Sequence, residues 1–321
     1  MKRKVLLVAF TTIWVAGIGF FLPSPAPAAY PEKPVKLICT FPAGGAIDLT
    51  ARVITETVKK HFPKPMVVVN RPGGAGTVGA AEIIQAYPDG YTIGITAVAV
   101  LTVQPHRTKL PYASPEDYTP ILKVVNVPIG LGVKAELPYK TVPEFVAYAK
   151  AHPGKIRVGN PGIGTIAHLN IEQLKRMADI DVSSVPFGGA AEGIPALLGG
   201  HIEGYAFHPG DIISHVKNGT TRILGTFEEK RNPHFPEAPT FKELGYDITG
   251  GIYFLIIGPK GLSPQIVSTL DDAIKKAMAD PVFIDRIKKA NMDPSYAGPS
   301  EIKKQLLKEY ETNAKYLAFL K

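Results

Sequence analysis

The stretch KLICTFPAGGAID, residues 36–48, decides the fold of this chain. Its first part, residues 36–41, is a short apolar run of strand length, and residues 42–45 form a turn of proline, alanine and two glycines. Beyond the turn, apolar side chains recur at helical spacing at Leu49, Val53, Ile54 and Val58. This order predicts a strand, a glycine loop and then a helix.

The same alternation of strand and helix continues through most of the chain. Strands are expected at residues 66–69, 91–95, 156–159, 182–186, 202–207, 221–226 and 252–257. Helices are expected at residues 80–85, 142–151, 166–177, 194–198 and 212–217, with two amphipathic helices near the C-terminus. Strands separated by helices predict an α/β fold in which each sheet is mainly parallel and flanked by helices.

Two sets of these units predict two lobes. Residues 29–124 and 223–321 are assigned to the first lobe, and residues 125–222 to the second. Lobes joined by more than one segment form a hinged cleft, where small ligands usually bind. Each lobe has a glycine loop before a helix, where free N–H groups and the helix dipole favour an anion. The alternative is that both loops are only tight turns.

The N-terminal residues 1–28 are predicted to be a signal peptide. Basic residues 2–4 precede an apolar stretch at 5–22, and Ala26 and Ala28 fit the small-residue positions of a cleavage site. The alternative is a membrane anchor, since about 18 apolar residues come close to spanning a bilayer. No cysteine lies near the cut, so we expect a soluble periplasmic protein without a lipid anchor.

The composition argues against several classes of protein. The 321 residues carry a formal net charge of +8. Three of the basic residues lie in the predicted signal peptide. No run of five or more Lys or Arg occurs, so nucleic acid is not an expected partner. One cysteine and eight scattered histidines give neither an internal disulfide nor a Cys-rich zinc site, and no metal or cofactor is expected. We expect a monomer.

One glycine motif keeps an enzymatic alternative open. Residues 74–79, GAGTVG, match the G-x-G-x-x-G pattern that can cradle a dinucleotide between a strand and a helix. The acid that should follow about 20 residues later is missing from residues 96–101. We therefore expect no enzyme, and the alternative is an exported dinucleotide-binding enzyme that uses Gly74, Gly76 and Gly79.

Several motifs together resemble a known family. They are YPEKPVKLI at residues 30–38, FPAGGAID at 41–48, VNRPGGAG at 69–76, PDGYT at 88–92, VPFGG at 185–189 and PEAPT at 236–240. In this order they closely resemble the Bug-type receptors of tripartite tricarboxylate transporters. The resemblance implies a two-lobed, type II-like periplasmic binding protein that captures a small carboxylate and delivers it to a membrane permease. A ligand sensor that feeds a signalling partner is the alternative with the same receptor features.

The resemblance also implies which residues bind the ligand. The first loop, Phe41 to Asp48, would hold a carboxylate through backbone groups and water, with Gly44, Gly45 and Ala46 nearest. Asp48 would order the loop or hold water, and its alternative role is to face the dipole at the helix start. The second lobe would contribute the following residues: Gly164, the Thr165 hydroxyl, the His168 imidazole and Gly188. An ordinary helix histidine is the alternative for His168.

The chain departs from the family pattern at a position that bears on the ligand. The strand after Leu198-Gly199-Gly200 commonly ends in an aromatic residue and then a cleft-facing aspartate, but here Phe207 stands at the acid and His208 follows it. A cationic amine then lacks its obvious partner. We therefore expect a ligand without an ammonium group, with an apolar or aromatic body resting on Phe207. The alternative is an alignment shifted by one residue.

Overall fold

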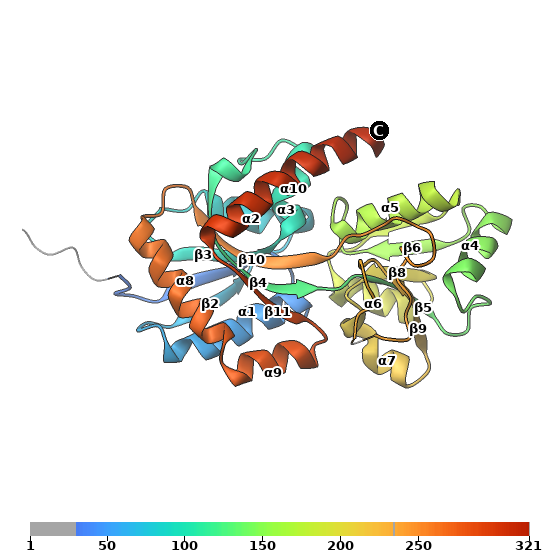
Figure 1. Ribbon diagram of the computed structural model, residues 1–321, viewed down its shortest axis with the longest axis horizontal. Helices are drawn as coiled ribbons and strands as arrows, with labels where there is room; N and C mark the ends of the chain where they lie inside the picture. The colour runs from blue at the N-terminus through green and yellow to red at the C-terminus, as the bar shows by residue number, and fades with distance from the viewer. Residues whose placement is uncertain (1–29, 234, 321) are drawn as a thin grey trace, which may run out of the picture.

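The chain folds into two lobes, each built on its own sheet (Figure 1). The computed structural model describes residues 30–233 and 235–320, so the predicted signal peptide lies outside the described residues. Within those ranges no helix is both long and apolar enough to cross a membrane. Two sheets with flanking helices confirm the predicted α/β class and two-lobed architecture.

The sheet of the first lobe has six strands in the order β11-β4-β10-β3-β1-β2. They are β1 (Val35–Cys39), β2 (Met66–Asn70), β3 (Thr92–Ala97), β4 (Tyr118–Val127), β10 (Ile252–Pro259) and β11 (Asp293–Ala297). β1 lies between β2 and β3 and runs parallel to both, with Leu37 opposite Val68 and Ile93. The loop that follows β1 therefore leaves the carboxyl end of this parallel part of the sheet.

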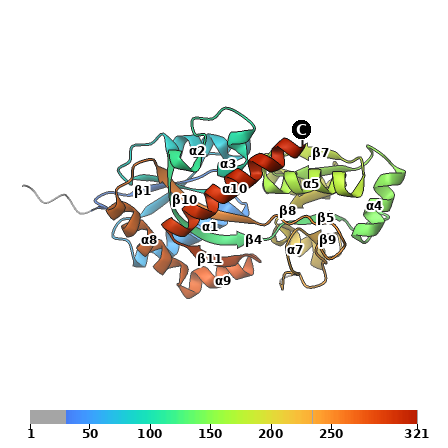
Figure 2. The ribbon, with the colours of Figure 1, turned by 45° about the horizontal axis from the view of Figure 1, so that its top comes forward.

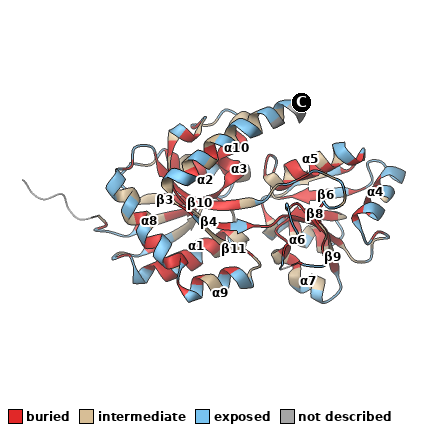
Figure 3. Cartoon of the chain, viewed as in Figure 1, coloured by how far each residue is buried: buried red, intermediate tan, exposed pale blue. Residues whose placement is uncertain are grey.

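Helices flank this sheet, with their buried faces turned toward it (Figure 3). They are α1 (Ala46–Thr57), α2 (Thr77–Ile84), α3 (Val98–Thr102), α8 (Pro264–Met278), α9 (Pro281–Lys289) and α10 (Pro299–Leu320). The long helix α10 runs along the first lobe, and its C-terminal end comes close to the second lobe (Figure 2). There Leu317 packs against a small apolar cluster that contains Ala99, Val103 and Leu169.

The sheet of the second lobe has five strands in the order β7-β6-β8-β5-β9. They are β5 (Gly130–Lys134), β6 (Arg157–Asn160), β7 (Ser183–Pro186), β8 (Gly204–Phe207) and β9 (Thr221–Thr226). Its helices are α4 (Val142–Ala151), α5 (Ile166–Ala178), α6 (Ala190–Leu198) and α7 (Ile213–Lys217), with a short 3₁₀ turn at Pro209–Ile212. The second glycine loop thus joins β6 to α5, as the first joins β1 to α1.

The strand directions correct one part of the sequence prediction. Both sheets are mixed instead of mainly parallel, because β10 runs antiparallel to β3 and β4, and β5 runs antiparallel to β8 and β9. The sequence analysis did not predict β4, β5 or β11. Successive strand-helix units give parallel pairs, whereas β4 and β10 extend toward the other lobe and pair antiparallel, with the whole second lobe between them in the chain (Figure 1).

The chain passes between the two sheets twice. The first passage joins β4 to β5 through residues 128–129, and the second leads back into β10. The boundary expected after residue 222 falls inside β9, all of which belongs to the second sheet. Phe227, Phe241 and Ile248 are also buried in the core of the second lobe. By sheet and core membership, the second lobe therefore continues to about residue 250.

Candidate functional site

A cavity of about 90 Å³ lies between the lobes, with walls from both. The first lobe contributes apolar side chains such as Phe41 and Val100, and the second contributes Phe207. No Lys or Arg occurs among the described lining residues, whose titratable groups are His208 and Asp211. Nor do the described residues contain a cluster of His, Cys, Asp or Glu that could hold a metal ion. An anion in this cavity therefore meets no Lys or Arg side chain, and its remaining donors are backbone N–H groups and His208.

Three helices begin at the cavity wall. The N-cap residues of α1, α5 and α6 are Gly45, Thr165 and Gly189, and all three line the cavity with the first helical residues that follow them. The glycine caps have no side chain that could accept hydrogen bonds from the first N–H groups of α1 and α6, so these groups are available to a ligand. The helix dipoles add partial positive charge at the same points. One helix start from the first lobe and two from the second therefore face one anion-binding space.

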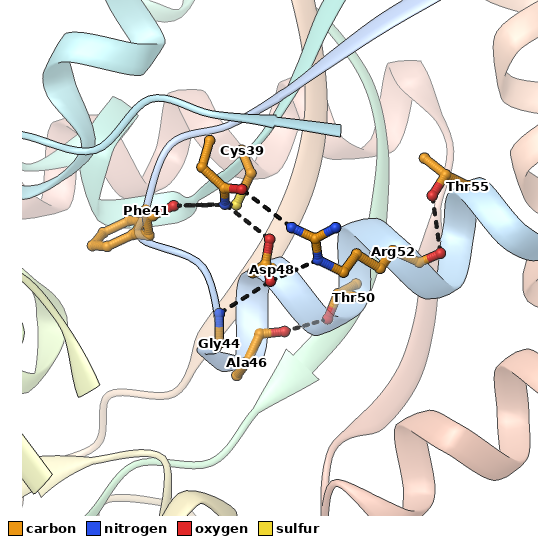
Figure 4. A network of polar contacts seen from close by, with 9 residues as sticks. Cys39, Phe41, Gly44, Ala46, Asp48, Thr50, Arg52 and Thr55 are labelled. Carbon is orange, nitrogen blue, oxygen red and sulfur yellow. Dashed lines mark hydrogen bonds and ion pairs between the residues drawn. The ribbon is translucent and has the colours of Figure 1, made fainter. Parts of the chain in front are cut away.

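Asp48 does not line the cavity. It orders the first loop through the hydrogen bonds drawn in Figure 4. Its Oδ2 accepts hydrogen bonds from the Gly44 N–H at 3.0 Å and from Arg52 Nε at 2.9 Å. Its Oδ1 accepts from Asn70 Nδ2 at 2.8 Å, and the same Asn70 nitrogen lies 3.1 Å from the Phe41 carbonyl oxygen. Burial alone would raise the pKa of this carboxyl, but the donors outweigh burial and lower it. The Gly44 N–H is therefore already bonded to Asp48, and Gly44 does not line the cavity wall.

The polar groups expected from the second loop already bond to one another. The Thr165 hydroxyl donates to the Gly162 carbonyl at 2.8 Å and accepts from the His168 N–H at 3.2 Å, which makes it a helix cap. The Gly164 N–H lies 3.2 Å from His168 Nδ1, and the Gly188 N–H donates to Glu192 at 2.9 Å. Thr165 lines the cavity, but Gly164, His168 and Gly188 do not.

His168 faces a separate surface hollow beside Arg107 and Glu172. Burial lowers the pKa of its imidazole, so the ring is neutral near pH 7 and can accept the Gly164 N–H. His168 thus bonds within its own helix start and does not line the cavity.

The end of β8 brings one further charged group to the cavity. Phe207 and His208 line it, and His208 Nε2 lies 2.6 Å from the Ala290 carbonyl of the first lobe. Asp211, in the turn that follows, also lines the cavity and was missed from the sequence. Burial raises the pKa of its carboxyl, and the nearby His208 offsets part of that shift. An acid four residues after Phe207 in a Pro-Gly turn is the signal that could have found it.

The glycines of the dinucleotide-like motif are explained by close packing. A Cβ on Gly79 would come within 2.6 Å of the Arg71 carbonyl oxygen, and one on Gly76 within 2.7 Å of Val100 Cγ2 and 3.0 Å of Phe41. Gly74 and Gly76 also have positive φ. This loop lines a second opening of about 740 Å³ between the lobes, where Gln104 Nε2 donates across the gap to the Ile163 carbonyl at 2.7 Å.

Comparison with known proteins gives consistent matches over nearly the whole chain. Residues 50–317 match the model of the tripartite tricarboxylate transporter family receptor. A UPF0065 protein from the gbd 5′ region of Cupriavidus necator is 38% identical over 92% of this chain and 90% of its own length.

Solved structures agree with these matches. The periplasmic binding protein BugD superposes with a TM-score of 0.85 at 27% identity, covering 91% of this chain and 98% of BugD. Rpa4515 of R. palustris, solved with adipate, gives a TM-score of 0.83 at 25% identity and covers 89% and 97% of the two chains.

Proposed function

The chain belongs to the tripartite tricarboxylate transporter receptor family, and on that premise we propose that it captures a small carboxylate between its lobes and delivers it to a transporter of that type. Its general role, shared with the matched family, is that of a periplasmic solute-binding receptor. The adipate bound to Rpa4515 supports a carboxylate as the ligand class. The permease is proposed from the family description alone.

The observation that carries the proposal is the meeting of three helix starts at one cavity. A carboxylate offers four lone-pair positions, so it can accept several N–H bonds at once. We infer that its donors are the first N–H groups of α1 and α6, at Ala46, Ile47, Ala190 and Ala191, with the start of α5 beside them. A ligand that bonds to donors from both lobes binds the closed form more tightly than the open one, which shifts the lobes toward closure.

The ligand class is tested by thermal unfolding of the mature protein against mono-, di- and tricarboxylates, aromatic acids, amino acids and NAD. A ligand at about 100 times its Kd adds about 2.7 kcal/mol, which raises the melting temperature by several degrees. We expect shifts with carboxylates. A shift with NAD alone would instead support a dinucleotide-binding protein.

The proposed donors are tested at Ala190, the first residue of α6. Ala190→Pro removes one N–H group while keeping a residue that helices accept at their first position; α8, α9 and α10 already begin with proline. Ala190→Gly is the matched control, because it keeps the N–H and removes only the methyl group. A hydrogen bond to a charged group contributes about 1.5–3 kcal/mol, so proline should weaken carboxylate binding about ten- to hundredfold. Equal affinities of the two variants would refute the assignment.

A further inference from the structure

The first-lobe loop with the G-x-G-x-x-G pattern comes into contact with the second lobe. Its Ala75 faces Gly162 of the second glycine loop, where a Cβ would lie 2.9 Å from the Ala75 Cβ. Beside this contact, Gln104 Nε2 donates to the Ile163 carbonyl oxygen at 2.7 Å. Because the two loops belong to different lobes, these contacts exist only when the lobes are close together.

Ala75 holds a backbone conformation that disfavours its own side chain. Its φ of 53° and ψ of 38° lie in the left-handed region, which costs stability for a residue with a Cβ. Glycine avoids that cost, as the neighbours Gly74 and Gly76 do at positive φ. The Ala75 methyl group that makes the conformation costly is also the group that meets Gly162. Strain held at a point of contact between the lobes indicates a function for that contact.

Both loops are held firmly at the contact. The Gly162 N–H donates to Asn160 Oδ1 at 3.0 Å, and the Gly162 carbonyl accepts from the Thr165 hydroxyl at 2.8 Å. The first-lobe loop is closed around its central residue by the Gly76 N–H, which donates to the Gly73 carbonyl at 3.0 Å. Neither loop can yield without disturbing these bonds, so the contact is sensitive to a single added methyl group.

The contact lies between the ligand cavity and the second opening. In the second-lobe loop, Pro161 and Thr165 line the cavity, whereas Gly162 and Ile163 line the opening of about 740 Å³. In the first lobe, Pro42 lines both spaces. The two loops therefore form a partition between a bound ligand and this opening.

We propose that Ala75 and Gly162 form a latch that holds the lobes closed over a captured acid. The methyl group of Ala75 seats on the bare backbone of Gly162, and any side chain at residue 162 would keep the loops apart. Neither residue lines the ligand cavity, so both are positioning residues that act through closure. The inference rests on the proposed function, in which the lobes close on a carboxylate. It gives the dinucleotide-like motif a role in closure.

Equilibrium binding by calorimetry with butyrate, succinate, adipate and citrate tests the latch. Gly162→Ala should weaken binding of the tightest of these acids about five- to hundredfold, because the new methyl group overlaps that of Ala75. Adding Ala75→Gly removes the overlapping atom and leaves the residue 75 Cα at 3.4 Å, an ordinary contact. The double variant should therefore bind within about threefold of Ala75→Gly alone.

The rescue separates the contact from backbone strain. Gly162 has a φ of 128°, so alanine is strained there, but this strain is the same in the single and the double variant. Gly154→Ala is the matched control, because Gly154 also has positive φ and its Cβ would lie 3.4 Å from Asp181 Oδ2 in its own lobe. It should keep the wild-type affinity.

The outcomes separate the latch from the function on which it rests. If Gly162→Ala binds like wild type, or if the double variant binds as weakly as Gly162→Ala, the latch is refuted while carboxylate capture stands. If Gly162→Ala does not fold, Ala75→Asn decides, since asparagine accepts the left-handed conformation and its longer side chain should weaken binding; unchanged affinity would refute the latch. If no acid binds, here or in the wider thermal panel, both proposals are overturned.

Discussion

Replacing Asp48 with Asn should destabilise the first lobe and weaken ligand binding together. In the native loop, Oδ2 of Asp48 accepts from Gly44 and Arg52, and Oδ1 accepts from Asn70. An asparagine can keep its oxygen toward only one of these sides, so its NH₂ group must face another donor. Asn70 cannot turn its amide to compensate, because its nitrogen also donates to the Phe41 carbonyl and its oxygen accepts from Arg52 at 3.3 Å.

The size of the effect follows from these contacts. The Arg52 side chain is 55% exposed, so its ion pair with Asp48 contributes less than about 1 kcal/mol. The buried donor that loses its acceptor costs about 1–3 kcal/mol more. We therefore expect Asp48→Asn to lower the free energy of unfolding by about 1–4 kcal/mol, which lowers the melting temperature by roughly 2–16 °C for a domain of 150–250 residues.

Urea unfolding as a function of pH tests the reasoning. Because the pKa of Asp48 is lowered in the folded state, its contribution is fully present above the unfolded pKa of about 3.9 and is lost as the pH falls through the folded pKa. The gap between wild type and variant should therefore close on acidification below pH of about 4. Asp247→Asn, at an exposed position, is the control. Equal stabilities at pH 7 would refute the argument, and so would a gap that persists unchanged in acid.

Three further measurements probe packing, closure and reactivity. Gly76→Ala should lower the free energy of unfolding in urea by about 2–4 kcal/mol, because the added Cβ would overlap its neighbours at a positive φ. The control Gly219→Ala, at a positive φ in open space, should lower it by about 1 kcal/mol. Equal losses of stability would contradict the packing argument. Gln104→Ala removes a bond between the lobes, so carboxylate affinity should fall about two- to tenfold and the radius of gyration from X-ray scattering should increase; an unchanged profile would contradict this. Burial raises the pKa of the Cys39 thiol to about 11. Mass spectrometry should therefore show no alkylation of Cys39 at pH 8 until the chain is unfolded, and rapid alkylation of the folded protein would refute this expectation.

The parts of the fold that follow local sequence rules were predictable. The strand and helix around the first glycine loop were placed within a few residues of β1 and α1, because apolar periodicity and a glycine turn are local signals. β4 was missed because its partner β10 lies more than a hundred residues away, beyond the whole second lobe. Its direction, and hence the mixed sheets, depends on that distant pairing.

The candidate site was predictable only in outline. The resemblance to a family pointed to both glycine loops and Phe207, and the structure places Gly45, Ala46, Thr165 and Phe207 on the wall of the candidate cavity. It could not show that Thr165 and His168 bond within their own loop, because such short-range competition leaves no trace in composition or spacing. Asp211 was missed because its side chain reaches the cavity through a turn whose path the sequence does not specify.

The helix starts that face the cavity have a consequence for how such receptors diversify. Their donors belong to the peptide backbone, and a point substitution to any residue except proline leaves them in place. The ability to hold an acid is thus inherited with the fold, and it survives mutations that would abolish a site built from arginine or lysine. The side chains that line the rest of the cavity, such as Phe207 and Asp211, can vary without loss of that ability. New nutrients can then be recruited by changing very few side chains, so overall sequence identity between two such receptors is a poor guide to whether they carry the same solute.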